Sequence, residues 1–466
     1  MQLPQELLDS LHGVPGFNRE AFVNVHAAAP APVSVRLNPA KAGNTEAFAG
    51  TLFGHSPRRP ELSPVPWSRY GYYLSERPSF TFDPLFHAGL YYVQEASSMF
   101  LEQALRQAAD LSQSLRVLDL CAAPGGKSTH LQSLISPGSL LVSNEVIRAR
   151  AGVLRQNIVK WGASNVLVTS NDPEHFGRLP GFFDVIVADA PCSGSGLFRR
   201  EPEAIGEWSP GAVQLCCGRQ KRILADVLPA LKEGGLLVYS TCSYSREENE
   251  EVGDWLAGQG MQAVALTLDA GWGIEPAAGA ASIGYRFFPD KVQGEGFYLA
   301  VFRKTGSTPE KRIKPASLVK ADKKETALVE PWLQPGEWLV YREPHLHALP
   351  AGQAEAYGLV KSALYVQHAG VTVGAAMRDK LVPDHALALS TALAGGVPAT
   401  DVPYETAVRY LQREELSLER AQKGWQLLRY EGHNLGWINA LQNRINNYYP
   451  KEFRILKRTD DSGFEK

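Results

Sequence analysis

Short apolar runs separated by stretches of helical pattern fill residues 115–305 and constrain the fold more than any other feature. Each run ends in glycine, proline or polar residues, and helical stretches such as RARAGVLRQNIVKWG (148–162) lie between the runs. Strands that alternate with helices predict a parallel sheet, and strands this apolar are expected to be buried on both faces. The predicted strands are RVLDLC (116–121), LLVSNE (140–145), NVLVT (165–169), FDVIVAD (183–189), GLLVYST (235–241) and FYLAVFRK (297–304).

Length and composition set broad limits on the protein. Its 466 residues are too many for one small core, so we expect roughly two to four domains. A hydrophobic fraction of 44% and a charged fraction of 21% fit a folded soluble protein. The formal net charge of -2 excludes a global basic field, so any nucleic-acid binding must come from local patches. The five cysteines show neither a disulfide framework nor zinc-ligand spacing, so we expect no bound metal.

The sequence also indicates the compartment. The N-terminus lacks the basic start and apolar run of a signal peptide. No stretch reaches about 18 apolar residues, which is the length that a membrane-spanning helix needs. We therefore expect a cytoplasmic protein with no membrane partner, and nothing in the sequence demands more than a monomer.

The pattern changes on both sides of the predicted sheet. Residues 1–110 are mixed, and their last part, YYVQEASSMFLEQAL (91–105), is typical of an amphipathic helix. Seven Lys and Arg residues against three Asp and Glu residues in 304–325 indicate a linker. Beyond it, short strands, a helix and a hairpin at 423–441 indicate a small α+β appendage. We expect an N-terminal extension (1–110), a central α/β domain (111–305), a basic linker (306–325) and a C-terminal region (326–466).

The segment VLDLCAAPGGKSTHL (117–131) predicts a strand, a tight glycine turn and a helix. Doubly wound sheets bind ligands at such a turn, where Gly125 and Gly126 allow close backbone approach to the free N–H groups of the helix. The turn is neither GxGxxG nor GxxxxGK[ST], which disfavours NAD and the phosphates of ATP. A glycine turn by itself is also consistent with a simple tight corner.

Acidic residues after the next two strands favour a nucleoside cofactor. Glu145 ends the second strand, 26 residues after Asp119, and an acid at this place commonly binds a ribose diol. Asp172 follows the third strand, where its carboxylate is placed to contact an adenine amine.

Two cysteines come just past the carboxyl ends of two predicted strands. They are Cys192 and Cys242, and this edge is where parallel sheets hold their ligands. A thiolate is a strong nucleophile, so both are candidates for covalent chemistry, and their spacing does not say which one attacks. Cys216 and Cys217 lie on a predicted helix and are expected to be packed side chains. Lys221 on that helix is either near the active site or a solvated surface lysine.

These motifs resemble one family. CAAPGGK (121–127), ADAPCSGSG (188–196) and STCSY (240–244) look like the Nol/Nop/Sun family of RNA 5-methylcytosine methyltransferases, as do RLNPAK (36–41), GLYYVQEASS (89–98) and GLFRREPEAIGEWSP (196–210). The resemblance covers roughly residues 30–305 and implies a Rossmann-like S-adenosylmethionine-dependent methyltransferase core. It implies that the cofactor is bound by the backbone of the turn, with Glu145 on the ribose, Asp172 near the adenine and Asp189 near the methionine end. The turn residues are Cys121, Ala122, Ala123, Pro124, Gly125, Gly126 and Lys127.

The resemblance also implies a covalent mechanism. Cytosine C5 is a poor nucleophile, but a thiolate that adds to C6 turns the ring into an enamine whose C5 can attack a sulfonium methyl group. The resemblance assigns this attack to Cys242 and assistance in the later release to Cys192. It places the carboxyl group of Asp189 near N3 of the base, where it helps to protonate the ring. DNA cytosine methyltransferases have their nucleophile in a Pro-Cys motif, so this assignment depends on the likeness to the RNA family.

A methylated base must leave its stack, so we expect an unpaired cytosine and nearby RNA contacts. Arg199 and Arg200 are placed to hold flanking phosphates, or else form an exposed loop pair. The segment NRINNYYPKEFRILKR (443–458) interleaves basic and aromatic residues, which is typical either of RNA binding or of a core strand with a solvated face. The residues are Arg444, Lys451, Arg454, Lys457, Arg458, Tyr448, Tyr449 and Phe453.

The C-terminal segment indicates a substrate class. KGWQLLRYEGHNLGW (423–437) and YYPKEFR (448–454) resemble the PUA-like tail of ribosomal RNA small-subunit methyltransferases F. This likeness favours 16S ribosomal RNA or the small ribosomal subunit as the partner, with RNA-binding roles for the N-terminal extension and the C-terminal region. A transfer-RNA enzyme of the same family and a non-catalytic ribosome-assembly factor are the alternatives. A DNA methyltransferase is disfavoured, because no large target-recognition region separates the motifs.

Overall fold

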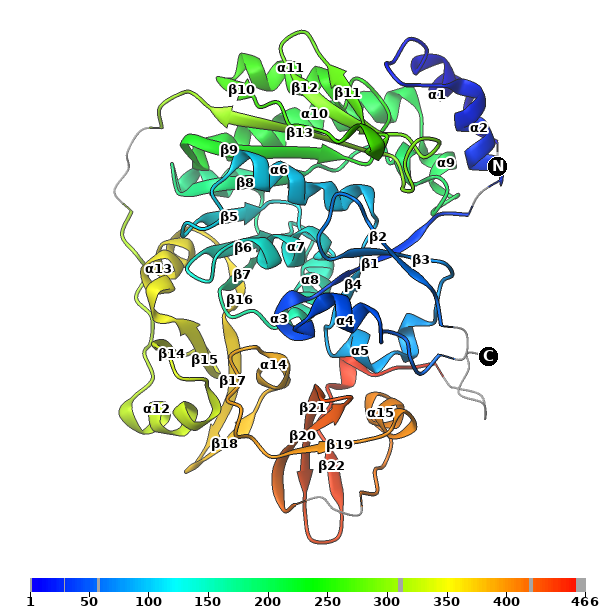
Figure 1. Ribbon diagram of the computed structural model, residues 1–466. Helices are drawn as coiled ribbons and strands as arrows, with labels where there is room; N and C mark the ends of the chain where they lie inside the picture. Colours follow the sequence, from blue (N-terminus) through cyan, green and yellow to red (C-terminus); the bar gives the residue numbers. More distant parts are fainter. Residues whose placement is uncertain (1, 29, 57–58, 309–312, 419–421, 458–466) are drawn as a thin grey trace.

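A central mixed sheet dominates the computed structural model, which describes residues 2–28, 30–56, 59–308, 313–418 and 422–457 (Figure 1). Its strands lie in the order β11-β12-β13-β9-β8-β5-β6-β7-β16. Five neighbouring strands are parallel: β5 (Arg116–Asp119), β6 (Leu140–Asn144), β7 (Val166–Thr169), β8 (Phe183–Asp189) and β9 (Leu231–Thr241). These strands and β13 (Phe297–Lys304), which is antiparallel to β9, confirm the predicted strands.

The other strands beyond β9 complete that edge of the sheet. β12 (Ile283–Phe287) pairs antiparallel with β13, and β11 (Glu275–Ala278) pairs with β12. β10 (Met261–Ala263) pairs with the far end of β13.

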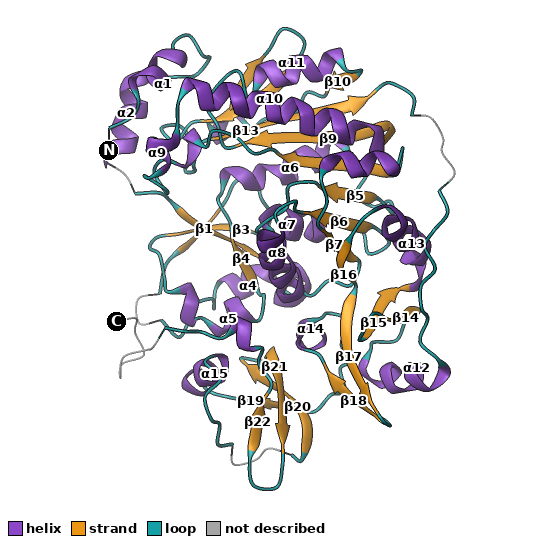
Figure 2. Cartoon of the chain, turned by 180° about the vertical axis from the view of Figure 1, so that it is seen from behind, coloured by secondary structure: helices purple, strands orange, loops and turns teal. Residues whose placement is uncertain are grey.

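Helices cover both faces of the sheet, as the apolar strands predict (Figure 2). One face packs against α6 (Leu101–Ala108), α7 (Gly126–Leu134) and α8 (Arg148–Trp161). The other packs against α10 (Pro210–Val227), α11 (Glu250–Gly258) and α13 (Ala354–Ala363). Successive strand residues alternate between the two cores: Val117 lies in the first and Leu118 in the second. This alternation explains why successive central positions of these strands are apolar.

The N-terminal extension forms a second sheet in the order β2-β3-β1-β4. Its strands are β1 (Val33–Leu37), β2 (Leu62–Pro64), β3 (Gly71–Leu74) and β4 (Tyr91–Val93). Helices α1 (Gln5–Ser10) and α2 (Arg19–Ala28) precede them, and α3 (Pro39–Ala42), α4 (Thr45–Ala49) and α5 (Pro84–His87) lie between them.

The prediction of a helix over residues 91–105 is wrong in its first part. Residues 91–93 are β4, because they pair antiparallel with β1, and Tyr91 lies opposite Leu37. The regular helix α6 begins only at Leu101. Non-local pairing with a strand more than fifty residues earlier leaves no mark in the local pattern that suggested a helix.

The C-terminal region contains two small sheets and also joins the central one. The first has β14 (Trp338–Arg342), β15 (Leu346–Pro350), β17 (Val371–Met377) and β18 (Lys380–Pro383), and the second has β19 (Ala399–Asp401), β20 (Gly424–Tyr430), β21 (His433–Ala440) and β22 (Ile445–Asn447). Helices α12 (Lys323–Val329), α14 (His385–Leu389) and α15 (Tyr404–Leu411) accompany them. The predicted hairpin over 423–441 is confirmed as β20 and β21.

One strand of the C-terminal region extends the central sheet. β16 (Val366–Ala369) pairs antiparallel with β7, so the described part of the C-terminal region supplies an edge strand to the α/β core. The α/β class is confirmed, whereas the boundaries of the four predicted regions stay a prediction. Within the described ranges, no helix is long and apolar enough to cross a membrane.

Candidate active site

The glycine turn of residues 117–131 lies at a crevice in the central sheet. β5 has β6 on one side and β8 on the other, and ligands of open α/β sheets bind where the strand order reverses in this way. Gly125 has a φ of 118°, and an added Cβ there would lie 3.3 Å from Leu154 Cδ1. Asn157 Nδ2 donates to Pro124 O at 2.8 Å. Helix α8 therefore holds the turn tightly from one side and leaves its other side to the crevice.

Asp119 ends β5 beside the turn and is fully buried. Its Oδ2 accepts a hydrogen bond from Ser128 Oγ at 2.6 Å, and its Oδ1 has no hydrogen-bond partner among the described residues. Burial raises the pKa of Asp119 to about 7. A buried polar atom without a partner is rare in proteins, and here it lies beside the crevice.

Glu145 follows β6 at the same edge. Its Oε1 accepts a hydrogen bond from the backbone N of Ile147 at 2.9 Å. The neighbouring Val146 and Ile147 are 53% and 51% exposed, which is unusual for large apolar side chains. A carboxylate next to an apolar surface fits a ribose diol that carries a purine ring. The glycine turn, Asp119 and the combination of the Glu145 carboxylate with the exposed apolar residues after it together fit an adenosine-bearing ligand.

Asp172 follows β7, the next strand along this edge. It caps the short helix Pro173–Arg178, and its Oδ1 lies 3.4 Å from Arg222 Nη1. Asn144 joins the ends of three strands, because its Nδ2 donates to Leu120 O and to Asn171 O at 3.2 and 3.0 Å. The sequence analysis missed Asn144, since a single asparagine at a strand end has no distinctive pattern.

The two candidate nucleophiles lie side by side. Cys192 Sγ and Cys242 Sγ are 3.1 Å apart, just beyond the ends of β8 and β9. The hydrogen bond with Cys242, together with burial, raises the pKa of the Cys192 thiol well above its ordinary value. Burial also raises the pKa of Cys121, which fits its expected role as a packed residue of the turn. Cys216 and Cys217 lie on α10 as predicted; Cys217 is 5% exposed and belongs to the core.

Lys127 and Asp189 form an ion pair in the same crevice. Lys127 Nζ lies 2.7 Å from Asp189 Oδ2, and Ser240 Oγ donates to Asp189 Oδ1 at 2.7 Å. Burial alone would lower the pKa of Lys127, but the Asp189 carboxylate raises it above its ordinary value. Lys127 Nζ also lies 5.2 Å from the centre of the Phe297 ring. The sequence analysis expected only the backbone of Lys127, whereas its side chain also lies in the crevice.

The N-terminal helices pack against the segment that carries Cys242. Tyr244 is buried, stacks on Phe288 with ring centres 5.9 Å apart, and meets the edge of Phe22 at 4.9 Å. Phe22 lies on α2 and shares a small core with residues of α1. The N-terminal extension therefore helps to fix the loop after β9.

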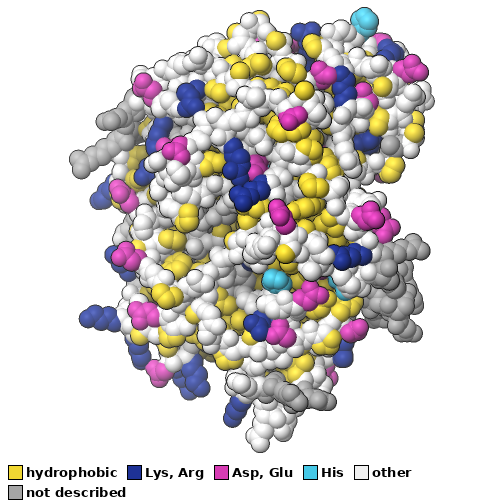
Figure 3. All heavy atoms as spheres, viewed as in Figure 1, with side chains coloured by type: hydrophobic (Ala, Val, Ile, Leu, Met, Phe, Trp, Pro, Cys, Tyr) yellow, Lys and Arg dark blue, Asp and Glu magenta, His cyan; other side chains and the backbone are white. Residues whose placement is uncertain are grey.

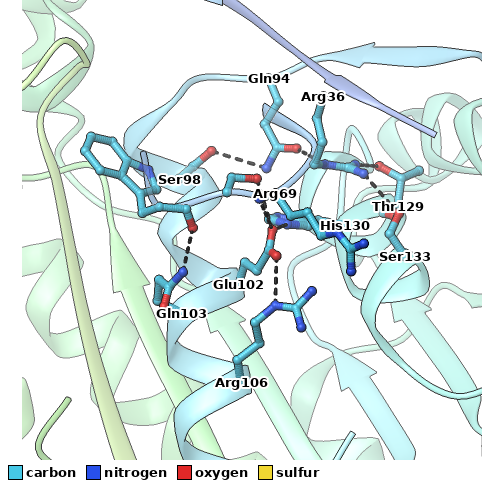
Figure 4. Close-up of polar contacts among 12 residues, drawn as sticks. Arg36, Arg69, Gln94, Ser98, Glu102, Gln103, Arg106, Thr129, His130 and Ser133 are labelled. Carbon is cyan, nitrogen blue, oxygen red and sulfur yellow. Dashed lines mark hydrogen bonds and ion pairs between the residues drawn. The ribbon is translucent and has the colours of Figure 1, made fainter. Parts of the chain in front are cut away.

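A buried polar network joins the N-terminal sheet to the cofactor-side helix α7 (Figure 4). Arg36 is fully buried and donates to Gln94 Oε1 at 2.7 Å, Thr129 Oγ1 at 2.6 Å and Ser133 Oγ at 3.2 Å. Its Nη2 also donates to Gly126 O at 3.3 Å, in the first turn of α7. Burial lowers the pKa of Arg36 to about 9. One arginine of the RLNPAK motif thus holds the helix that begins at the glycine turn.

The same network includes Glu102 on α6 (Figure 4). Glu102 accepts hydrogen bonds from Ser68 Oγ and from Arg69 N, both at 3.1 Å, and from Arg106 Nε at 2.8 Å. His130 Nε2 lies 3.3 Å from the same carboxylate. Glu102 and Arg106 also line a groove of about 1170 Å³ between the N-terminal sheet and α6. These contacts join α6 to the segment between β2 and β3 of the N-terminal sheet.

The prediction that Arg199 holds RNA phosphates is wrong, and so is its alternative, an exposed loop pair. The Arg199 side chain is 4% exposed, and its Nη2 donates to Glu295 Oε1 at 2.9 Å and to Gly294 O at 2.8 Å. The guanidinium is therefore neutralised inside the protein and cannot meet a phosphate. Arg200 remains a candidate RNA contact, since it is 51% exposed, although it pairs with Glu201.

Only part of the aromatic C-terminal segment faces solvent. Tyr448 is 41% exposed, and its ring centre lies 4.4 Å from that of Trp425 on β20. Tyr449 is 2% exposed, and Phe453 packs against other core side chains. Arg458 lies outside the described residues. The sequence analysis did not single out Trp425, because its pairing with Tyr448 depends on the fold of the hairpin.

Basic residues flank this aromatic pair. Lys423 and Arg444 are exposed at the same end of the β20–β22 sheet. Elsewhere charges of both signs are interspersed over the visible face of the molecule, in line with the net charge of -2 (Figure 3). Local patches of this kind are therefore the candidates for RNA binding.

Known families match an N-terminal, a central and a C-terminal part of the chain. Residues 107–303 match the family described as 16S rRNA methyltransferase RsmB/F. Residues 3–96 match the N-terminal domain of 16S rRNA methyltransferase RsmF, and residues 397–455 match the methyltransferase RsmF PUA domain.

Solved structures share the fold of the central part. A methyltransferase homolog from Pyrococcus horikoshii is 30% identical, with a TM-score of 0.53 over 65% of this chain and 100% of that chain. The NSun6 structure from Pyrococcus horikoshii with SFG is 20% identical, with a TM-score of 0.55 over 65% of this chain and 99% of that chain, and shows the fold alone.

Curated relatives named ribosomal RNA small subunit methyltransferase F extend the match. The protein from Pectobacterium atrosepticum is 35% identical over 317 residues, which span 66% of this chain and 64% of the relative, slightly less than two thirds of its length. The protein from Vibrio vulnificus is 30% identical over 471 residues, which span 97% of both chains. The chain therefore belongs to the ribosomal RNA small subunit methyltransferase F family.

Proposed function

We propose that this protein transfers a methyl group from S-adenosylmethionine to C5 of a cytosine in 16S ribosomal RNA, through a covalent bond between Cys242 and C6 of the base. The observation that carries the proposal is the contact of 3.1 Å between two thiols, beside an ion pair and a nucleoside-type crevice. Family membership supports the substrate class.

S-adenosylmethionine fits the residues at the carboxyl edge of the sheet, and when bound it supplies an electrophilic sulfonium methyl group. The turn from Cys121 to Lys127 would hold it through backbone groups, with Glu145 on the ribose. Val146 and Ile147 would cover one face of the adenine, and Asp172 would lie near its amine.

Membership of the methyltransferase family and the place of Cys242 in the STCSY motif support Cys242 as the nucleophile. A thiol must ionise before it attacks. In the proposed reaction the Cys242 thiolate adds to C6 of the cytosine. Asp189, held by Lys127 and Ser240, contacts the base near N3 and assists its protonation.

After methyl transfer, the C5 proton passes to solvent water, the electron pair of its bond restores the C5–C6 double bond, and the bond between C6 and Cys242 Sγ breaks so that Cys242 leaves as a thiolate. Cys192 assists this release, because its sulfur lies within hydrogen-bond distance of the departing thiolate.

The pair of Trp425, which is partly buried, and Tyr448, which is exposed, is the proposed RNA contact of the C-terminal region. Aromatic rings stack on unpaired bases, and the flanking Lys423 and Arg444 provide charge for the adjacent phosphates. A 16S ribosomal RNA substrate places the reaction in the cytoplasm, and the proposal needs no metal and no second copy of the chain.

The direct test uses tritiated S-adenosylmethionine with small ribosomal subunits, bare 16S ribosomal RNA or bulk transfer RNA, followed by nucleoside analysis. We expect label in 5-methylcytidine from the ribosomal samples, and none with Cys242→Ala, which should still bind the cofactor. Label only in transfer RNA would overturn the substrate assignment. Absence of label from all samples would favour a non-catalytic assembly factor.

A further inference from the structure

Three consecutive residues, just before and at the start of α11, lie beside the loops that carry Cys192 and Cys242. Glu248, Asn249 and Glu250 are 0%, 0% and 4% exposed, and the proposed reaction gives none of them a role. Each of them contacts the loop that follows β9, directly or through one other side chain.

The carboxylate of Glu248 joins the two cysteine loops. Its Oε1 accepts a hydrogen bond from Ser193 N at 2.7 Å, and its Oε2 accepts from Ser193 Oγ at 2.6 Å and Ser243 Oγ at 2.5 Å. Ser193 directly follows Cys192, and Ser243 directly follows Cys242. One side chain therefore fixes the residues next to both sulfur atoms.

The two neighbours of Glu248 hold the Cys242 loop alone. Asn249 Oδ1 accepts from Thr241 Oγ1 at 2.6 Å, and its Nδ2 donates to Ser243 O at 2.8 Å. Glu250 pairs with the buried Arg286 at 2.6 Å, and Arg286 in turn donates to the backbone O of Tyr244. Of the three residues, Glu248 is the one whose side chain also bonds to the Cys192 loop. The two loops further meet directly, through Gly196 N to Cys242 O at 2.8 Å and Tyr244 N to Ser195 Oγ at 2.9 Å, and Glu248 adds a carboxylate bridge next to both sulfur atoms.

The chemistry of the contacts requires a carboxylate. All donors that meet Glu248 are uncharged: one backbone N–H, two hydroxyl groups and Gln220 Nε2 at 3.3 Å. An ionised carboxylate accepts all of them at once, whereas a glutamine amide would present two donors of its own. Burial raises the pKa of Glu248, and its charge contributes to the raised pKa of Cys192. A buried carboxylate without a cationic partner is costly, so structural packing alone does not explain it.

We propose, on the basis of the proposed methyltransferase function, that Glu248 is a positioning residue that holds Cys192 and Cys242 at reacting distance. Its carboxylate bridges the serines that follow the two cysteines and sets the separation of the sulfur atoms. Its negative charge also raises the pKa of the Cys192 thiol.

The test compares Glu248→Gln with Glu251→Gln, which changes an exposed glutamate three residues later, in the first turn of α11. For Glu248→Gln we expect unchanged binding of S-adenosylmethionine and about a 100-fold lower kcat, since small misplacement of reacting groups has costs of this order. The alkylation rate of Cys192 by iodoacetamide, followed by peptide mass spectrometry, should rise at a lower pH than in the wild type. Glu251→Gln should match the wild type in each measurement.

Unchanged kcat and an unchanged alkylation profile in Glu248→Gln would overturn the proposal. If that variant does not fold, Ser193→Ala removes one hydroxyl of the bridge, and wild-type kcat and alkylation in Ser193→Ala would overturn it equally. Thiol alkylation needs no RNA. If the wild-type protein methylates no RNA, but the Cys192 alkylation profiles of wild type and Glu248→Gln still differ as expected, the proposed function is refuted and the positioning role is retained.

Discussion

Gly196→Ala tests how closely the Cys242 loop must be held. An added Cβ at Gly196 would lie 2.4 Å from Gly296 O and 2.8 Å from Cys242 O. Carbon–oxygen contacts are normally about 3.3 Å or longer, so one of these segments must move by roughly 0.5 to 1 Å. Gly196 N also donates to Cys242 O at 2.8 Å, so movement at Gly196 passes directly to Cys242. The φ of Gly196 lies outside the left-handed region, so the substitution acts through contact alone.

A displacement of this size at a reacting group lowers kcat by about 100-fold. Such a loss corresponds to about 2.7 kcal/mol in the activation free energy. The assay is single-turnover methyl transfer at saturating S-adenosylmethionine, with cofactor affinity measured separately. Affinity should not change, because the glycine turn follows β5 and not β9. Gly206→Ala is the control, since its Cβ would meet nothing within 4 Å. A kcat for Gly196→Ala equal to that of Gly206→Ala would refute the reasoning.

Three further variants probe release, RNA binding and stability. Cys192→Ala should accumulate a covalent protein–RNA adduct on denaturing gels, and a methylated product without any adduct would speak against its role in release. Replacing Trp425 and Tyr448 by alanine should weaken RNA binding by about 1–3 kcal/mol per base that no longer stacks, measured by filter binding, with cofactor affinity retained. Arg286→Met should lower the free energy of unfolding by about 3–5 kcal/mol in urea titrations, because it leaves the Glu250 carboxylate buried without its cation. An unchanged unfolding midpoint would mean that the ion pair contributes little.

Local pattern was sufficient to predict the strands of the central sheet. Each of them is apolar at successive positions because its two faces pack against different helix layers, as Val117 and Leu118 show. The same argument placed Cys192 and Cys242 at one edge, because the carboxyl ends of parallel strands meet there. The position of the strand ends does not say which cysteine attacks and which assists release. The resemblance to a family assigned these roles to Cys242 and Cys192.

Contacts between distant residues could not be predicted in this way. Arg199 was expected near RNA, but its partner Glu295 lies 96 positions later and neutralises it. The contact of Glu248 with the Cys192 loop spans 55 positions, and glutamate at a helix start is common for other reasons. Tyr448 and Tyr449 are adjacent and chemically identical, yet the first is 41% exposed and the second 2% exposed, because the fold turns their side chains to different surroundings.

Helix α8 connects the cofactor crevice to both flanking regions. It begins shortly after Glu145 and ends at a turn whose carbonyl groups have no partner within the helix. Asn38 Nδ2 from the N-terminal sheet donates to Trp161 O at 3.0 Å, and Thr391 N from the C-terminal region donates to Gly162 O at 2.9 Å. The same helix holds the glycine turn through Leu154 and Asn157, so the turn and the contacts from both flanking regions share one element.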